Sequence, residues 1–365
     1  MALTFKKFFS SLSQSAAGGP SRVVGIDVGS ASLKVVELEQ TEKAITLRTY
    51  GELQLGPYAE KDLGEVVSLE PQKLTEALVD VIRESTVKAK NGVLAIPLNS
   101  SFVTVVPIKT SSSEEVDAKV KLEARKYIPV PLSDVMLDWS LLNEYGDKEE
   151  HINEVLLAAI QNDAFERYVK LMASIEMPSQ PSEIEVFSAI RGVHQPTDET
   201  LAIIDLGAET SKLYITKDGA LQRIHRVYEG GVTGTKRIAQ ALNISFAEAE
   251  DLKRSYTPEI SNAREIFKAY ITTVDRSVQE FKRVIEQYEA RIEGQVDRVV
   301  MIGGGAQFQG VSRHVADLLA RDVEFGKPFE RVAYPAFMED VLTEAGTSFA
   351  TALGAALRPF ETPVE

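Results

Sequence analysis

The spacing of apolar residues in the first hundred positions alternates between a strand pattern and a helix pattern. Strand-like segments cover residues 23–29, 33–39 and 45–55, and a turn with glycine and serine joins the first two. This arrangement predicts a β-hairpin followed by a third strand. A helical pattern follows near residues 71–88, and the uninterrupted aliphatic run GVLAIPL at 92–98 is typical of a buried strand.

Residues 101–180 have a pattern of their own, which predicts a small inserted α/β unit. We expect strands at 101–108, 134–143 and 153–161, and helices from about Ser113 to Tyr127 and from Asn162 onward. Ser113 and Asn162 are typical N-cap residues, and Pro129 and Pro131 indicate where the first of these helices ends.

The opening pattern returns in the second half of the chain. LAIIDLGAETSKLYI at 201–215 repeats an apolar strand, Asp-x-Gly, a few small polar residues and a second apolar strand. Such a repeat predicts two halves of similar architecture. Residues 235–292 are mostly helical in pattern, with apolar residues three, four and seven positions apart on one buried face. These residues are Ile266, Tyr270, Ile271, Val274, Val278, Phe281, Ile285, Tyr288 and Ile292.

Composition narrows the class of protein. The 365 residues suffice for two or three domains, and the formal charge of −14 argues against nucleic acid as the main ligand. The absence of cysteine excludes disulfides and thiol chemistry and fits a cytoplasmic protein. No apolar run approaches the roughly 18 residues that cross a bilayer, so we expect only peripheral membrane contact.

The first 22 residues are expected to form a flexible segment. Four apolar side chains in it share one face of an amphipathic helical stretch: Phe5, Phe8, Phe9 and Leu12. Two lysines, Lys6 and Lys7, stand beside this face. A disordered tail and a docking or membrane-touching helix are both compatible with this pattern.

The two Asp-x-Gly turns carry the candidate chemistry. A hairpin turn with glycine and serine presents successive backbone N–H groups, which can hold a phosphate. An aspartate beside such a turn would repel phosphate unless a cation lies between them, and Mg²⁺ takes one or two carboxylates together with water and phosphate oxygens. We therefore expect Asp27 and Asp205 to hold Mg²⁺ through water from two sides of a cleft, with Lys34 near the same oxygens.

A triple glycine strengthens this interpretation. One Asp-x-Gly turn alone is more often just a turn, but the chain has two, and Gly303, Gly304 and Gly305 follow a third apolar strand. A glycine loop lets the backbone approach a base or ribose closely. Neither G-x-x-x-x-G-K-[ST] nor G-x-G-x-x-G occurs, so the phosphate loop and the dinucleotide fingerprint are absent.

These motifs, in this order, resemble the actin-like ATPase superfamily. VVGIDVGSASLK resembles its first phosphate motif, LAIIDLGAETSK the second and RVVMIGGGAQFQGV the adenosine motif, while residues 182–192 and 346–358 match its two connecting helices. The resemblance implies an α/β, actin-like (ribonuclease H-like) duplicated two-lobe fold with an inserted small α/β subdomain. The implied parts are an N-terminal segment (1–22), a first lobe (23–100 and 181–197), an insertion (101–180), a second lobe (198–234 and 293–345), a helical subdomain (235–292) and a connecting helix with tail (346–365).

Within this superfamily the chain looks most like the PilM family of type IV pilus assembly proteins, near the division protein FtsA. KLEARKYIPVPLSDVMLDWSLL at 121–142 is similar to that family's inserted subdomain. The resemblance implies ATP and Mg²⁺ as ligands. The implied nucleotide contacts are Gly29, Ser30, Ala31, Ser32, Lys34, Gly207, Ala208, Glu209, Thr210, Lys236, Glu250, Lys253, Gly303, Gly304 and Gly305.

A slow ATPase activity is the most that the resemblance implies. Hydrolysis needs a group that aligns water with the terminal phosphate. Glu185 matches the glutamate that does so in relatives, with Val186 where relatives commonly have proline. The sequence leaves open whether Glu183 is a surface charge and Glu185 the water-aligning residue, or neither. A sugar or carboxylate kinase of the superfamily is the enzyme alternative, but it would need a further buried aspartate, and none is evident.

The family resemblance also implies a partner. It predicts a nucleotide-gated scaffold at the cytoplasmic face of the inner membrane, which binds the N-terminal cytoplasmic tail of a PilN-like membrane protein in a groove between the first lobe and the insertion. First candidates for that groove are Tyr127, Ile128, Pro129 and Trp139. Pilus ATPases are further candidate partners, and an FtsA-like filament former is the remaining alternative.

Overall fold

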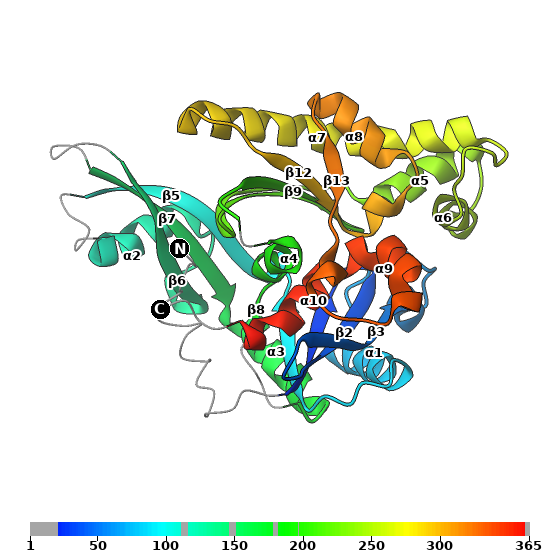
Figure 1. The fold of residues 1–365 in the computed structure, drawn as a ribbon, viewed down its shortest axis with the longest axis horizontal. Helices are drawn as coiled ribbons and strands as arrows, with labels where there is room; N and C mark the ends of the chain where they lie inside the picture. The colour runs from blue at the N-terminus through cyan, green and yellow to red at the C-terminus, as the bar shows by residue number, and fades with distance from the viewer. Residues whose placement is uncertain (1–20, 111–115, 146–150, 178–181, 196, 362–365) are drawn as a thin grey trace.

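The fold was analysed in a computed structural model, which describes residues 21–110, 116–145, 151–177, 182–195 and 197–361. The expected helix face at Phe5, Phe8, Phe9 and Leu12 and the expected N-cap Ser113 lie outside these residues. Within the described chain there are two five-stranded sheets and one three-stranded sheet (Figure 1). The three sheets support the predicted division into two lobes and an insertion, whose boundaries we keep as a proposal.

The first sheet has the strand order β3-β2-β1-β4-β8. Its strands are β1 (Arg22–Val28), β2 (Ser32–Gln40), β3 (Ile45–Gln54), β4 (Asn91–Ile96) and β8 (Glu183–Ile184). The β1–β2 and β2–β3 pairs are antiparallel, and β4 runs parallel to β1. The opening hairpin and its third strand are thus confirmed. Helix α1 (Pro71–Glu84) packs on this sheet and ends before the expected residue 88, because Thr86 has a φ of 53° and turns the chain toward β4.

The second sheet repeats this order as β11-β10-β9-β12-β13. Its strands are β9 (Thr200–Leu206), β10 (Ser211–Lys217), β11 (Ala220–Val227), β12 (Arg298–Ile302) and β13 (Val323–Phe325). Helices on it are α5 (Gly231–Leu242), α6 (Phe246–Arg254), α7 (Ala263–Ile292) and α8 (Val311–Leu319). Eight of the nine apolar residues expected on one face of α7 are buried, and the ninth, Ile292, is partly buried. The repeat in the sequence therefore reflects a duplicated architecture.

The third sheet belongs to the insertion and has the order β5-β7-β6. Its strands are β5 (Ser101–Thr110), β6 (Val135–Tyr145) and β7 (His151–Gln161), and α2 (Val116–Tyr127) packs on it. Helix α3 (Asn162–Ser174) follows β7 and returns to the first sheet. The N-cap of α3 is Gln161, so the expectation for Asn162 was wrong. The Asn162 amide instead donates to the Ser133 carbonyl at 2.9 Å, which ties the helix start to the segment before β6.

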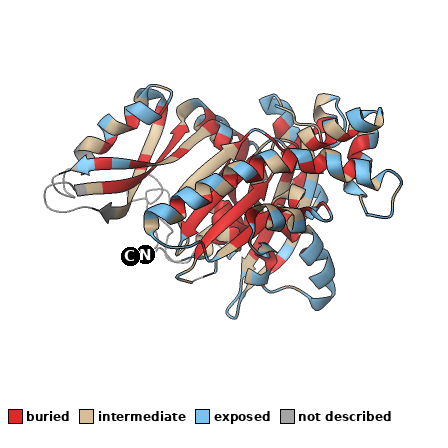
Figure 2. Cartoon of the chain, turned by 90° about the horizontal axis from the view of Figure 1, so that it is seen from above, coloured by how far each residue is buried: buried red, intermediate tan, exposed pale blue. Residues whose placement is uncertain are grey.

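Two helices join the lobes at close range. They are α4 (Glu185–Val193) and α10 (Ala350–Leu357), and α9 (Glu339–Ala345) precedes the latter. A Cβ on Gly354 would lie 1.8 Å from the Ser188 carbonyl oxygen, so only glycine permits this approach. Figure 2 shows the buried residues gathered in the strands of the sheets and on the helix faces that cover them. The packed helices fix where the strand ends of the two lobes face each other.

Candidate functional site

A cleft of about 860 Å³ opens between the ends of the two five-stranded sheets. Both Asp-x-Gly turns line it, together with the glycine loop after β12, the start of α4 and part of α6. The predicted site residues in its lining are Asp27, Gly29, Ser30, Ala31, Ser32, Lys34, Glu185, Asp205, Gly207, Ala208, Glu209, Thr210, Glu250, Lys253, Gly303, Gly304 and Gly305. Lys236 is exposed on α5 and is not in the lining, so the structure does not bring it to the cleft.

The two turns have the same backbone geometry. The Gly29 N–H donates to the Ser32 carbonyl at 3.0 Å, and the Gly207 N–H donates to the Thr210 carbonyl at 3.1 Å. In each turn a Cβ on the glycine would lie 2.8 Å from that carbonyl oxygen. This crowding explains why glycine stands two residues after each aspartate, since any side chain would have to push the turn open.

Each aspartate faces a lysine on the neighbouring strand. Asp27 pairs with Lys34 across β1 and β2, and Asp205 pairs with Lys212 across β9 and β10. Residues directly opposite each other in an antiparallel pair lie on the same face of the sheet. Lys212 was missed by sequence reasoning, although its spacing of seven residues from Asp205 equals that of Lys34 from Asp27.

Lys212 connects the second lobe to the start of α4. Its Nζ lies 3.2 Å from Asp205 Oδ2 and 3.2 Å from Glu185 Oε2. Burial alone would lower the pKa of Lys212, but these carboxylates outweigh it and raise that pKa well above its usual value. Glu185 also accepts a hydrogen bond from the Leu98 N–H at 2.8 Å. Helix α4 begins at Glu185 even though valine follows it.

Asp27 is in a different electrostatic state from Asp205. Among the described residues its carboxylate has no ion pair, because Lys34 donates to Ser32 Oγ at 2.7 Å and lies 3.4 Å from Glu52. Burial raises the pKa of Asp27 to about 6, with Lys34 opposing and the charge of Glu185 adding to the rise. A carboxylate held in this way gains by binding a cation.

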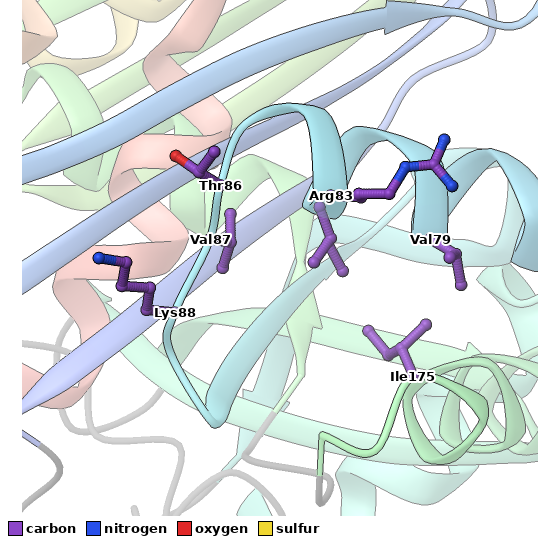
Figure 3. Close-up of a pocket in the computed structure, with 7 residues that line it drawn as sticks. Val79, Arg83, Thr86, Val87, Lys88 and Ile175 are labelled. Atoms are coloured by element: carbon purple, nitrogen blue, oxygen red, sulfur yellow. The ribbon is translucent and has the colours of Figure 1, made fainter.

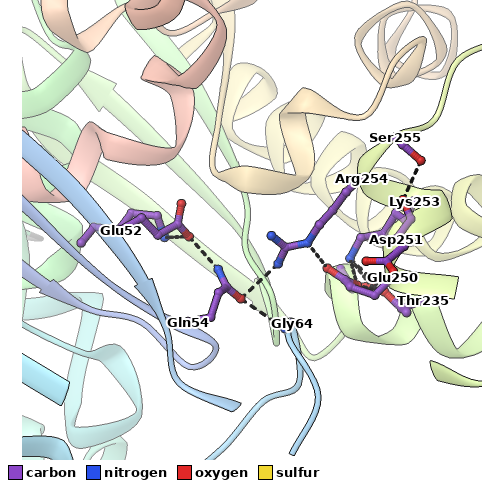
Figure 4. A network of polar contacts seen from close by, with 11 residues as sticks. Glu52, Gln54, Gly64, Thr235, Glu250, Asp251, Lys253, Arg254 and Ser255 are labelled. Carbon is purple, nitrogen blue, oxygen red and sulfur yellow. Dashed lines mark hydrogen bonds and ion pairs between the residues drawn. The ribbon is translucent and has the colours of Figure 1, made fainter. Parts of the chain in front are cut away.

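A polar network closes one side of the cleft (Figure 4). Glu250 is buried, and its Oε2 accepts hydrogen bonds from Thr235 and Lys253, both at 2.6 Å. Burial raises the pKa of Glu250, but the contacts of Lys253 and its other partners reverse this and lower it. Arg254 donates to Glu250 at 2.8 Å and to Gln54 of the first lobe at 3.0 Å. The two lobes are therefore in direct contact here.

Two expectations about acidic residues need correction. Glu183 is buried and not a surface charge, since it pairs with Arg191 and lies 3.6 Å from Arg358. A further buried aspartate does exist: Asp138 is 5% exposed in β6 of the insertion. Because Asp138 does not line the cleft, it gives no support to a kinase.

The donor set of the cleft fits a nucleotide with Mg²⁺. Carboxylate oxygens and turn N–H groups suit Mg²⁺ and phosphate respectively. A Cβ on Gly304 would have no atom within 4 Å, so this glycine leaves open space beside the loop for a base or ribose. The described residues hold no group of three or more His, Cys, Asp or Glu side chains that could bind a metal ion, so phosphate oxygens would have to complete its coordination.

The fold and the cleft define an actin-like protein with two duplicated lobes. The sequence profile of the type IV pilus assembly protein PilM family matches residues 25–360, and the chain belongs to that family. Among solved structures, a PilM–PilN type IV pilus biogenesis complex is similar at 24% identity, covering 93% of this chain and 99% of that one, with a TM-score of 0.76. MreB 5 of Spiroplasma citri bound to AMPPNP is similar at 11% identity, covering 92% and 95% of the chains, with a TM-score of 0.51.

A match to a cell division protein covers a smaller part of the chain. The cell division protein FtsA of Rhizobium meliloti (strain 1021) is 26% identical over 184 residues, which are 43% of this chain and 40% of FtsA. The chain thus matches less than half of the length of that protein. Within the described residues, no helix is both long and apolar enough to span a bilayer.

Proposed function

We propose that the cleft binds ATP with Mg²⁺ between the two lobes. The observation that carries this proposal is that two Asp-x-Gly turns of equal geometry and the open glycine loop line one cavity. The turns around Gly29 and Gly207 would hold phosphates, and Asp27 and Asp205 would hold the ion through water. Glu250 and Lys253 would contact the ribose or base, and the Mg²⁺ would screen the phosphates from the carboxylates.

Calorimetric titration with Mg-ATP tests this assignment. Asp27→Ala and Asp205→Ala should each weaken binding at least about tenfold, because each removes a charged ligand of the ion. Asp317→Ala is the matched control, since Asp317 is exposed on α8 and outside the cleft lining. If both cleft variants bind Mg-ATP like the control, the site assignment is wrong.

Glu185 is the proposed water-aligning residue of a slow ATPase. It lines the cleft at the first position of α4, and its carboxylate is oriented by Lys212 and the Leu98 N–H. Glu185→Gln should slow hydrolysis and leave Mg-ATP affinity nearly unchanged, because the amide still accepts from Leu98 but cannot take a proton from water. Steady-state phosphate release and a binding titration on the same sample separate the two effects. Unchanged turnover in Glu185→Gln would mean that another residue aligns the water.

We further propose that the protein is a nucleotide-gated scaffold for a PilN-like membrane protein. Family membership and the similar PilM–PilN complex support this proposal. A partner that contacts both the first lobe and the insertion would respond to lobe closure, and ATP would thereby alter its affinity. Binding the tail of a membrane protein would hold this chain at the cytoplasmic face of the inner membrane.

An apolar groove of about 450 Å³ is the proposed seat of that tail (Figure 3). Val79, Ile82 and Arg83 of α1 belong to its lining. Ile175, at the end of α3, lies opposite Val79 and Arg83. The groove thus lies between the first lobe and the helix that leads out of the insertion. Two of the earlier candidates fit less well, because Ile128 is buried in the insertion's own core and Trp139 packs against it. Tyr127 and Pro129 are exposed and stay candidates for a contact with the tail.

A synthetic peptide copying the tail of a PilN-like protein tests this groove. Val79→Asp and Ile175→Asp should each weaken peptide binding at least about tenfold, since a buried charge in an apolar contact is strongly unfavourable. Val341→Asp, a change at an exposed valine of α9, is the control. Equal binding by all three variants would exclude this groove.

A further inference from the structure

The two faces of the insertion's sheet are covered by different parts of the molecule. Successive residues of a strand point to opposite faces, and Val155 and Leu157 of β7 pack with α2 in the insertion's own core. Leu156 points the other way and belongs to an apolar core that also contains Leu221 and Tyr214 of the second lobe. Strand β5 lies against β11, an edge strand of the second sheet. The insertion therefore packs on the second lobe.

One buried carboxylate crosses this boundary. Glu154 is on the face of β7 that meets the second lobe, and it is 6% exposed. Its Oε1 accepts a hydrogen bond from Arg223 of β11 at 2.6 Å and another from Arg291 at the end of α7. Its Oε2 accepts one from Asn143 of β6 at 3.1 Å, and the same amide donates to Gln222 of β11 at 2.9 Å. We call these five residues the Glu154 cluster.

The charges within the cluster are balanced. Burial raises the pKa of Glu154, but the hydrogen bonds and charges of Arg291 and Arg223 outweigh it and lower that pKa to about 2. Both guanidinium groups also lie over the ring of Tyr288, at 5.9 Å for Arg223 and 5.4 Å for Arg291. The arginine side chains are 25% and 31% exposed, so they can be hydrated if the carboxylate is removed.

Two elements of the second lobe extend from this cluster to the cleft. Strand β11 carries Arg223, and Tyr228 just beyond its end lines the cleft. Helix α7 carries Arg291 in its last turn and Tyr270, which also lines the cleft. About 32 Å of helix separates these two residues of α7, which runs along the second lobe (Figure 1). A displacement of this side of the cleft would therefore reach the insertion through packed, regular elements.

The insertion is also continuous with the first lobe. Its first strand, β5, follows β4 after a turn at Leu98–Ser100. Strand β7, which carries Glu154, continues directly into α3, and α3 packs against α1 and β4. Ile175 at the end of α3 belongs to the lining of the apolar groove beside α1. Both lobes therefore hold the insertion, and β7 with α3 connects the Glu154 cluster to that groove.

We propose that the Glu154 cluster couples the insertion to the second lobe, so that the insertion follows this lobe when the cleft changes its width. Through β7 and α3, this movement alters the groove that contains Ile175. Nucleotide binding in the cleft and peptide binding in the groove are then linked by one free energy of coupling. The link to the groove rests on the proposed function, whereas the attachment of the insertion to the second lobe does not.

Two spin labels test this attachment in the free protein. The chain has no cysteine, so Lys121→Cys on α2 and Arg283→Cys on α7, both at exposed positions, can be labelled specifically. In this background Glu154→Gln should broaden the distribution of distances between the labels and shift it to longer values, because a neutral amide binds two arginines weakly. Glu289→Gln is the matched control, since this 12% exposed carboxylate binds Arg321 within the second lobe.

The distance distribution decides the outcome. If it is the same in Glu154→Gln and Glu289→Gln, the cluster does not hold the insertion and the proposal is overturned. Thermal midpoints show whether each variant is folded. If Glu154→Gln does not fold, Arg291→Gln changes a partly exposed partner instead and should give a smaller broadening, because Arg223 remains; an unchanged distribution would then overturn the proposal.

Peptide titrations with and without Mg-ATP test the link to the groove. Saturating Mg-ATP should change the affinity of the wild type for the synthetic tail peptide at least about fivefold, and Glu154→Gln should reduce this change to less than about twofold. A full nucleotide effect in Glu154→Gln would overturn the coupling through the cluster. If the wild type shows no effect of Mg-ATP, the nucleotide gating of the proposed function fails, and the distances between the labels still decide whether the cluster joins the insertion to the second lobe.

Discussion

The two Asp-x-Gly hairpins have the same backbone but different charge balance. Strand order, register and turn hydrogen bonds match between the lobes. Asp205 is nevertheless bound to Lys212, while Asp27 has a pKa raised to about 6 through burial and has no ion pair among the described residues. The partners of the two lysines produce this difference. Lys34 lies 3.4 Å from Glu52 on β3, whereas Lys212 lies between Asp205 and Glu185.

The comparison suggests separate tasks for the two hairpins. The first leaves its aspartate available, so we infer that Asp27 is the stronger ligand for a cation. The second uses its lysine to hold Glu185, so it links the second lobe to α4. A duplicated backbone therefore fixes where the groups stand, and side chains outside the motif determine their use.

The largest expected effect is on the two lysines. Lys212→Met should destabilise the chain by about 3–5 kcal/mol, because it leaves the buried Asp205 carboxylate and the partly buried Glu185 carboxylate without their cation. Lys34→Met should cost about 1 kcal/mol, because its partner Glu52 is 36% exposed and stays hydrated without the lysine. Urea denaturation at pH 7.5 without nucleotide measures both. Equal losses would mean that Lys34 and Lys212 contribute equally to the stability of the free protein.

The second prediction concerns the aspartates and pH. The pKa of Asp27 is 3.8 in its ordinary state and about 6 in the fold. An acid with a raised pKa opposes folding once it is ionised, so the wild type loses this part of its stability between about pH 4 and pH 6. Asp27→Asn should therefore stabilise the free protein by about 1–3 kcal/mol at pH 8 and by nothing at pH 4.

Asp205→Asn provides the contrast to this prediction. It should destabilise the chain at pH 8, because it removes one partner of a buried ion pair. Thermal unfolding from pH 4 to pH 8 follows both variants, and a stability gain in Asp205→Asn or a loss in Asp27→Asn at pH 8 would reverse the assigned charge states.

The sequence predicted the hairpins and their turns well because both depend on local chemistry. Glycine two positions after each aspartate is demanded by the turn itself, and the apolar strands on each side of it are evident from the pattern alone. Lys212 could have been predicted from the sequence, since it repeats the spacing of Lys34. Its ion pair with Glu185 could not, because that contact joins two elements that only the folded lobes bring together.

The wrong expectations have the same physical origin. Glu183 is acidic and two positions from Glu185, but its partners Arg191 and Arg358 come from two helices, one of them far along the chain. Lys236 follows Thr235, whose hydroxyl binds Glu250. Neighbouring residues on a helix point about 100° apart, so Lys236 faces solvent while Thr235 points inward to Glu250, which lines the cleft.

The third prediction concerns the pH dependence of Mg-ATP binding. If Asp27 must be ionised to hold the ion, affinity should fall about tenfold from pH 7 to pH 5 as the carboxyl is protonated. The Asp27→Asn variant should bind weakly with little change over the same range. Calorimetry in buffers of equal ionic strength gives the profile, and a wild-type profile that stays flat would exclude Asp27 as the titrating ligand.

The smallest effect is expected at the contact between the lobes near Gln54. Gln54 accepts hydrogen bonds from Arg254 at 3.0 Å and from the Gly64 N–H at 3.2 Å, but Arg254 is 47% exposed. Gln54→Ala should therefore reduce stability by less than about 1 kcal/mol. If this contact helps to close the cleft, the radius of gyration of the free protein should rise in X-ray scattering, and Mg-ATP should reduce it again. Gln240→Ala, a change at an exposed glutamine of α5 outside the cleft lining, is the control. A radius that is the same in both variants would leave the link between Lys212 and Glu185 as the contact that sets the spacing of the lobes.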